Sequence, residues 1–190
     1  MTELERYIET YFGLVRTDEL DAISALFRPI KLKKGACLLK AGKRCDQLSF
    51  VQEGMLRMFT LTDGKEVTQW ISTKGYFATD LSSFIHESAS RWTIQALVDT
   101  EAFSISKADY QRIGETVPRW DKLEKLFLIK CFTTLEERIF SHLSMTAEER
   151  YESFFESHRE LFNQVPLQYI ASVLGMTPET LSRIRSKQLP

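Results

Sequence analysis

The C-terminal stretch from Gln168 to Ser186 restricts the fold more than any other part of the sequence. Gly175 interrupts a helix-forming run there, and Thr177 and Pro178 follow it. Glycine accepts the left-handed conformation that ends a helix, threonine caps the start of one, and proline is tolerated at the first helical position. Ala171 is small at the point where two helices would cross. The segment therefore predicts two short helices joined by a tight turn, held together by Ile170, Leu174, Met176, Leu181 and Ile184.

This pattern is typical of a helix-turn-helix, whose second helix enters the major groove of DNA. Arg183 can donate two hydrogen bonds to guanine, and Glu179 can accept one from cytosine. Thr177 and the free N–H groups of the first turn can hold a phosphate. One alternative is a helical hairpin that does not bind DNA. For Glu179 and Arg183, the alternative is a solvent-exposed ion pair between residues four apart on one helix. The candidate DNA-binding residues are Thr177, Glu179, Thr180, Ser182, Arg183, Arg185 and Lys187.

The charge distribution is compatible with a local DNA-binding surface. The whole chain has 25 basic and 26 acidic side chains and a formal charge of -1, which excludes a general attraction to polyanions. Between Val165 and Pro190, however, three basic side chains stand against one acidic side chain. We therefore expect contact with double-stranded DNA to be confined to this end of the chain.

Between Ile30 and Ile105 the pattern changes to that of a β domain. Short apolar runs are separated by turn residues, among which Asp63-Gly64 is a strong hairpin signal. Many short strands with regular turns are typical of an antiparallel sandwich or barrel. The predicted strands of this module of about 75 residues are Cys37–Leu39, Leu48–Val51, Met55–Leu61, Val67–Ile71, Ile94–Val98 and Ala102–Ile105.

Helical patterns flank the β module on both sides. Residues 2–27 are predicted to be helical, with Thr17 as an N-cap and Pro29 as the stop. Ser106 is predicted to open a helix after the module, and Thr146 begins a capping box that opens another.

A segment without glycine or proline runs from Arg119 to Ser144 and predicts one helix of about 39 Å. A helix of this length lies between two compact regions, and the rest of the chain offers little surface to cover it. This favours pairing with a second copy of the chain. A core helix inside a monomer is the alternative. The apolar stripe along this helix is predicted to comprise Leu123, Leu126, Phe127, Cys131, Leu135, Ile139 and Leu143.

These elements predict an α+β chain in three parts. Residues 1–117 would hold N-terminal helices and an antiparallel β-barrel of the jelly-roll kind. Residues 118–144 would form a dimerisation helix, and residues 145–190 would form a helix-turn-helix domain.

This order of parts resembles the Crp/Fnr superfamily of bacterial transcription regulators over nearly the whole chain. The stretch from Gly35 to Gly54 is similar to the first half of the family's cyclic-nucleotide-binding-like barrel, and Glu-Thr-Leu-Ser-Arg matches the Fnr-like Glu-x-x-Ser-Arg motif. The resemblance implies that Glu179, Ser182 and Arg183 read bases. It also implies a homodimer through residues 118–144, with RNA polymerase as a further partner.

The sequence departs from the family at two places. The family usually continues into a short β wing, whereas Pro190 follows the second helix directly, so weaker contact with the DNA backbone is expected. The family's cyclic-nucleotide cassette has a glycine that approaches the phosphate, a glutamate that holds the ribose and an arginine that neutralises the phosphate. Thr79, Asp80 and Ser90 stand in their places here, and Arg91 comes one residue late.

A slip of one residue turns a strand side chain to the opposite face of the sheet. We therefore expect a regulator that responds to a small molecule other than cAMP, or to none. The candidate residues of an effector pocket are Thr79, Asp80, Leu81, Ser90 and Arg91.

Metal and cofactor sites are not expected. The cysteines lack the cluster that an iron–sulfur sensor needs, and isolated histidines are more often surface or packing residues. An odd number of cysteines without CxxC spacing fits reduced thiols in the cytosol. The residues concerned are Cys37, Cys45, Cys131, His86, His142 and His158.

Several function classes are not supported by the sequence. The longest unbroken aliphatic and aromatic run covers residues 126–129, against about 20 residues for a membrane span. The N-terminus resembles no secretory signal, so a cytoplasmic protein that does not associate with membranes is expected. The motifs of nucleotide-binding loops, hydrolases and zinc proteases are missing, which argues against an enzyme. A ligand-binding signalling module that acts through protein partners is the alternative, followed by a cupin-type enzyme, which would need clustered histidines.

Overall fold

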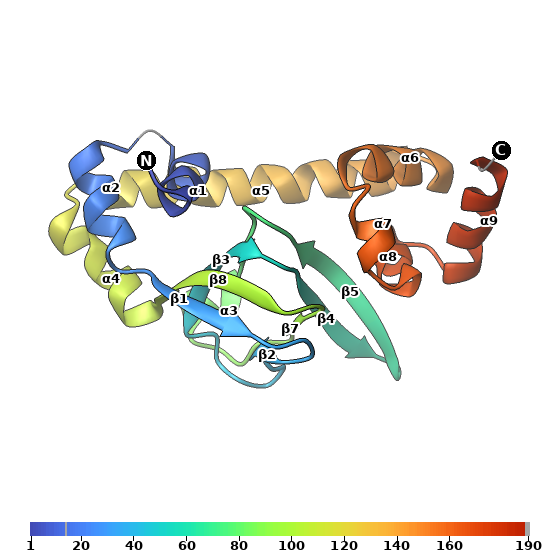
Figure 1. Cartoon of the computed structure of the whole chain (residues 1–190), viewed down its shortest axis with the longest axis horizontal. Coiled ribbons are helices and arrows are strands. Elements are labelled where there is room, and N and C mark those ends of the chain that lie inside the picture. Colours follow the sequence, from blue (N-terminus) through green and yellow to red (C-terminus); the bar gives the residue numbers. More distant parts are fainter. Residues whose placement is uncertain (14, 189–190) are drawn as a thin grey trace. The chain divides into compact units, whose positions relative to one another are not determined.

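The computed structural model describes residues 1–13 and 15–188 (Figure 1). Pro190, the predicted end of the DNA-binding domain, lies outside these residues. The chain divides into two compact units. The N-terminal unit comprises Met1–Met58 and Ile71–Phe132, and the C-terminal unit comprises Phe59–Trp70 and Thr133–Pro190.

The β module consists of two four-stranded sheets, which confirms the predicted α+β class with an antiparallel jelly roll. One sheet has the order β1-β8-β3-β6 and the other β2-β7-β4-β5. Leu48 lies opposite Ile105, and Phe50 lies opposite Phe103, in the antiparallel pair β3–β8. The strands are β1 (Arg28–Leu32), β2 (Cys37–Leu39), β3 (Gln47–Glu53), β4 (Leu56–Thr62), β5 (Lys65–Ser72), β6 (Phe77–Ala78), β7 (Thr93–Ala96) and β8 (Thr100–Ser106).

The N-terminal helical prediction needs two corrections. The region forms two helices, α1 (Glu3–Phe12) and α2 (Thr17–Ser24), because the chain turns at Gly13 with a φ of 85°. The N-cap of α2 is Arg16, whose N–H donates to the Glu19 carboxylate, and Thr17 is already helical. Pro29 does not stop a helix but lies in β1, an edge strand of its sheet, where its missing N–H leaves no gap in the ladder.

The core of the N-terminal unit lies where α1 and the first half of α5 (Trp120–Ser144) cover the sheet that contains β3. Phe12 stacks on Phe127 with ring centroids 4.8 Å apart. Phe50 of β3 packs against Tyr7 and Tyr11 at 6.0 and 5.6 Å. The unit also contains α3 (Leu81–His86), which the sequence analysis missed, and α4 (Lys107–Thr116).

An ion pair between the partly exposed Arg119 and the buried Glu19 fixes the start of α5 to α2. The Glu19 carboxylate is 3% exposed and lies 2.7 Å from Nη2 of Arg119. The hydrogen bond from Arg119 holds the pKa of this carboxyl below its ordinary value.

Helix α5 confirms the predicted long helix, but its apolar residues do not form one stripe. Leu123, Phe127 and Cys131 are buried in the N-terminal unit. Leu135, Ile139 and Leu143 are 44%, 61% and 81% exposed and belong to a second face. The spacing alone merged two faces, because both follow the period of an α-helix.

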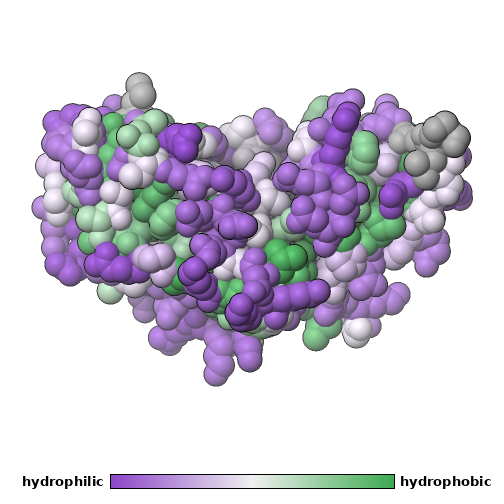
Figure 2. Space-filling model, viewed as in Figure 1, coloured by the Kyte–Doolittle hydropathy of each residue, from purple (hydrophilic) through white to green (hydrophobic). Residues whose placement is uncertain are grey.

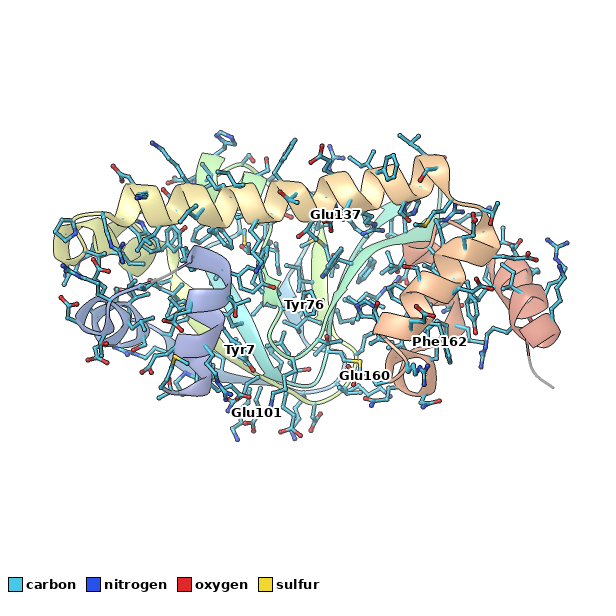
Figure 3. All side chains as sticks on the ribbon, turned by 90° about the horizontal axis from the view of Figure 1, so that it is seen from above. Tyr7, Tyr76, Glu101, Glu137, Glu160 and Phe162 are labelled. Atoms are coloured by element: carbon cyan, nitrogen blue, oxygen red, sulfur yellow. The ribbon has the colours of Figure 1, made fainter. Side chains whose placement is uncertain are left out.

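The C-terminal unit contains the remaining helices and part of the β4–β5 hairpin. An aromatic cluster packs Phe162, which is labelled in Figure 3, against Tyr151 with ring centroids 5.6 Å apart and against Phe155 with ring centroids 5.0 Å apart. The helices are α6 (Ala147–Ser157), α7 (Leu161–Gln164), α8 (Leu167–Val173) and α9 (Pro178–Gln188). Helix α7 was not predicted.

The predicted N-caps after the β module are confirmed. The Ser106 hydroxyl accepts from the N–H of Asp109, and Thr146 forms a capping box with Glu149. Among the described residues, none of the helices has the length and apolar character that crossing a bilayer requires. Hydrophilic residues cover most of the face that Figure 2 displays, with smaller apolar areas between them.

Candidate nucleic-acid interface

Helices α8 and α9 form the predicted helix-turn-helix. The N–H of Met176 donates to the carbonyl of Ala171 at 3.0 Å, and the N–H of Gly175 donates to Ser172 at 3.1 Å. These two bonds form a Schellman motif, which ends α8, and Gly175 has the required positive φ of 65°. Thr177 then caps α9, because its hydroxyl accepts from the N–H of Thr180 at 3.2 Å.

The apolar residues predicted to hold the two helices together are buried, except for Met176, which is half-buried. Leu181 of α9 is fully enclosed, and Ile184 one turn later is 3% exposed. Since these residues fix the inner face of α9, its opposite face is left to solvent. The buried set is Ile170, Ala171, Leu174, Leu181 and Ile184.

The outer face of α9 carries the predicted base-reading residues. Glu179, Ser182 and Arg183 are all exposed, and the spacing of three and four residues from Glu179 places them on adjacent turns. Thr177 is also exposed beside the first turn, whereas Thr180 is half-buried. The structure thus brings a carboxylate, a hydroxyl and a guanidinium together on one accessible helix edge.

The last two predicted contacts are engaged within the C-terminal unit. The Arg185 guanidinium lies 5.9 Å from the ring centroid of Phe162, and Arg185 is half-buried. Lys187 Nζ lies 2.7 Å from a carboxylate oxygen of Glu148 on α6. Lys187, and to a smaller extent Arg183, lower the pKa of Glu148. Glu148 therefore competes with any phosphate that Lys187 would contact.

The C-terminal turn of α8 is held by two arginines that the sequence analysis missed. Arg138 of α5 donates to the carbonyl of Val173 at 3.0 Å and to the carbonyl of Gln69 in β5. Arg150 of α6 donates to the carbonyl of Leu174 at 3.0 Å. Cations at a helix C-terminus satisfy its last carbonyls and oppose the negative end of its dipole. The only sequence signal was a single arginine among the apolar positions of a long helix.

A second exposed surface lies along α5. Ile129, Phe132, Leu135, Ile139 and Leu143 follow one another at spacings of three or four residues, and between 44% and 81% of each residue is exposed. These five residues thus form a row of apolar side chains that the described residues leave exposed.

The predicted effector residues divide into a closed cluster and an exposed arginine. The Asp80 carboxylate caps α3 by accepting from the N–H of Ser83 at 3.2 Å, and it accepts from the Ser90 hydroxyl at 2.7 Å. Thr79 is buried as well and donates to the carbonyl of Gln47 at 2.9 Å. Leu81, which begins α3, is half-buried.

Arg91 does not join this cluster. It is exposed, and its guanidinium lies 6.0 Å from the ring centroid of Trp92. The Asp80 carboxylate is thus paired with an amide and a hydroxyl donor, and the Arg91 guanidinium lies outside the cluster.

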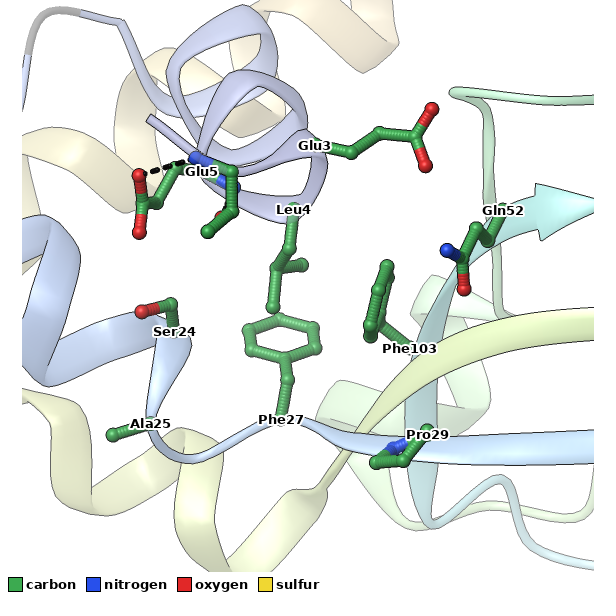
Figure 4. A pocket seen from close by; sticks show the side chains of 10 residues that line it. Glu3, Leu4, Glu5, Ser24, Ala25, Phe27, Pro29, Gln52 and Phe103 are labelled. Carbon is green, nitrogen blue, oxygen red and sulfur yellow. Dashed lines mark hydrogen bonds between the residues drawn. The ribbon is translucent and has the colours of Figure 1, made fainter.

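A separate hollow of about 470 Å³ lies in the N-terminal unit (Figure 4). Leu4, Phe27 and Phe103 form its apolar wall, and Glu3 and Gln52 lie at one side. Its lining includes none of the five predicted effector residues. Among the described residues, no group of three or more histidine, cysteine or acidic side chains could hold a metal ion.

Part of the β module and the helix after it match a known protein family. Residues 29–116 match the family described as the cyclic nucleotide-binding domain. The sequence matches no curated protein at a significant level.

Solved structures resemble a larger part of the chain. FixK2 from Bradyrhizobium japonicum has a TM-score of 0.70 and 19% identity, covering 85% of this chain and 83% of its own. The catabolite activator protein of Thermus thermophilus has a TM-score of 0.60 and 20% identity, covering 93% and 85%. The c-di-GMP-responsive global regulator CLP of Xanthomonas campestris has a TM-score of 0.66 and 14% identity, covering 91% of both chains.

At these identities the likeness concerns the fold, and at that level it confirms the resemblance predicted from the sequence. Residues 29–116 thus match the model of the cyclic nucleotide-binding domain, and most of the chain has a fold similar to that of FixK2, the catabolite activator protein and CLP.

Proposed function

We propose that this protein is a sequence-specific DNA-binding transcription regulator of the Crp/Fnr type. The observation that carries the proposal is the outer edge of α9, where Glu179, Ser182 and Arg183 are exposed above the buried Leu181 and Ile184. A helix held in this way can enter the major groove, whose width of about 12 Å admits an α-helix. Arg183 would donate hydrogen bonds to guanine and Glu179 would accept one from cytosine. The shorter side chain of Ser182 would form a hydrogen bond to a base through its hydroxyl.

The remaining contacts would go to the DNA backbone. Thr177 and the first-turn N–H groups of α9 suit a phosphate, since a helix N-terminus favours negative charge. Thr180, Arg185 and Lys187 would act as secondary contacts, and Lys187 would first have to leave Glu148. Contacts of this kind fix the register of a protein on DNA without reading its sequence.

The proposed active form is a homodimer through residues 118–144, paired along the exposed apolar row on α5. A second copy offers the same row, so that a two-fold interface covers both at once. Two copies of α9 would then address half-sites ~34–36 Å apart. The proposed domains comprise residues 1–117, 118–144 and 145–190. The protein would act in the cytoplasm, and RNA polymerase would be a further partner when it is bound to DNA.

We further propose that the β module responds to a molecule other than cAMP, or to none. The buried Asp80–Ser90 pair supports this, because Ser90 stands in the place of the arginine that neutralises a cyclic phosphate, and its hydroxyl donates to Asp80 instead. The similar regulator CLP responds to c-di-GMP, which indicates that this fold accepts other effectors. Thr79, Leu81 and Arg91 remain candidate pocket residues beside that pair.

Selection from random duplexes tests the proposal. The wild-type protein is expected to enrich a two-fold symmetric site, and its affinity should fall steeply with salt. Arg183→Ala should lose base preference at one position in each half-site, at a cost of about 1–3 kcal/mol. Ser157→Ala, at an exposed position of α6, is the matched control. An Arg183→Ala profile identical to the wild type, or no enrichment at all, would count against DNA reading by α9.

A further inference from the structure

Strand β5 ends its sheet, and within the C-terminal unit a hydrogen bond joins its edge to α8. The order β2-β7-β4-β5 leaves the outer side of β5 without a strand neighbour. The N–H of Thr68 on β5 donates to the hydroxyl of Ser172 at 2.8 Å. Thr68 is 1% exposed, so this is an enclosed contact and not a loose surface one.

Arg138 reinforces the same junction from a third element. One of its terminal nitrogens donates to Gln69 of β5 and the other to Val173 of α8, and its guanidinium lies 5.5 Å from the ring centroid of Trp70. The planar fork of arginine suits two acceptors at once, whereas a lysine offers only a point charge. Burial here lowers the pKa of Arg138. The guanidinium thus bridges β5 to the last turn of α8.

The junction leaves the base-reading edge open. It involves Ser172 and Val173 at the end of α8, whereas Glu179 and Arg183 on α9 are exposed. Docking therefore does not mask the edge that would meet DNA. It restricts the orientations that α8 can adopt, and α9 follows through the Schellman turn.

We propose that Arg138 is a positioning residue for DNA recognition: by tying β5 to the C-terminal turn of α8, it holds α9 in the orientation that meets DNA. The β4–β5 hairpin is then part of the DNA-binding apparatus, although its strands belong to the sensor sheet in the chain order. The inference rests on the proposed function. It goes beyond that proposal, because it assigns a role to residues that do not touch DNA. Holding the bound orientation in advance reduces the ordering cost of binding.

The experiment compares two arginines that both cap α8 but differ in their contact with β5. Arg138→Met keeps a long apolar side chain and removes the bridge. Arg150→Met removes the donor to Leu174 and does not involve β5. Hydrogen exchange measured by mass spectrometry on peptides that cover residues 59–72 should be about tenfold faster in Arg138→Met and unchanged in Arg150→Met.

A second variant guards against misfolding. Ser172→Ala removes the acceptor of the Thr68 N–H without changing charge, and Ser157→Ala on α6 is its matched control. Ser172→Ala should weaken binding to the selected duplex about fivefold, with the salt dependence of binding unchanged, whereas Ser157→Ala should bind like the wild type. The double variant Arg138→Met/Ser172→Ala should lose less affinity than the product of the two single losses, because both open one junction.

Two results would overturn the proposal. One is exchange in residues 59–72 that is equal in Arg138→Met and Arg150→Met. The other is duplex affinity in Ser172→Ala that equals or exceeds that of Ser157→Ala. If the wild type binds no duplex, the proposed function fails, while the exchange experiment still decides whether β5 is docked on α8.

Discussion

Replacing Gly175 by alanine tests the reasoning on the helix-turn-helix turn most directly. Gly175 has a φ of 65°, a left-handed conformation that costs a residue with a Cβ about 1–2 kcal/mol. A Cβ at this position would also lie 3.0 Å from Cδ2 and 3.1 Å from Nε2 of His142 on α5. That ring is held, because its Nδ1 bonds to the Arg138 carbonyl at 2.8 Å. Overpacking of this kind adds about 1–3 kcal/mol.

Gly42 provides the matched control. Its φ of 83° is also left-handed, but a Cβ there would meet nothing within 4 Å. Gly42→Ala should therefore lower the free energy of unfolding by about 1–2 kcal/mol, which is the cost of the left-handed backbone alone. Gly175→Ala should lower it by at least about 1 kcal/mol more, because of the contact with the ring. The two losses are measured by urea unfolding followed by circular dichroism.

A third comparison separates the two contributions at Gly175. In a His142→Ala background the ring is gone, so Gly175→Ala should then cost no more than Gly42→Ala does in the wild type. Equal losses for Gly42→Ala and Gly175→Ala in the wild-type background would refute the steric argument. A loss at Gly175 that persists without the ring would refute the assignment to His142.

Three further predictions concern an ion pair, the dimer and the charge beside α9. Arg119 lowers the pKa of the Glu19 carboxyl in the folded state, so the ionised carboxylate stabilises the fold above the ordinary pKa of 4.5, and this stabilisation is lost as the pH falls through the lower folded-state pKa. The urea midpoint of Glu19→Gln should therefore fall less between pH 6 and 3 than the midpoint of the wild type. Midpoints of the two proteins that fall equally over this pH range would contradict the prediction. Ile139→Asp should place a charge in the apolar row of α5 and raise the dimer dissociation constant about 30-fold or more in sedimentation experiments, whereas an unchanged constant would exclude this face. Glu148→Gln should free Lys187, strengthening duplex binding and increasing the salt slope by about 1, and an unchanged slope would show that Lys187 does not reach a phosphate.

The turn between α8 and α9 could be predicted because its causes are local. Gly175, Thr177 and Pro178 each restrict the backbone within one or two residues, and the structure has the left-handed turn and the hydroxyl cap that they imply. The caps at Ser106 and Thr146 are local in the same sense. Such features depend little on the rest of the chain.

Features set by tertiary contacts could not be predicted in this way. Phe127 and Leu135 both belong to the predicted stripe, yet Phe127 is buried against α1 while Leu135 is 44% exposed. Pro29 resembles a helix stop until the sheet shows that it lies in an edge strand. The role of Arg138 could not be predicted from its place in the long helix, because its acceptors lie 35 and 69 residues away along the chain. The effector residues around Asp80 stay a prediction, because their mutual hydrogen bonds do not identify a ligand.

The contact between Thr68 and Ser172 also has a consequence for the handling of this protein. The outer side of an edge strand is a template on which another chain can add a strand, and such additions lead to aggregation. A fragment that ends before α8 would leave the N–H of Thr68 and its neighbours open to that reaction. Shortened versions made to study the β module alone are therefore expected to self-associate through β5, unless a charged residue or proline is placed on that strand.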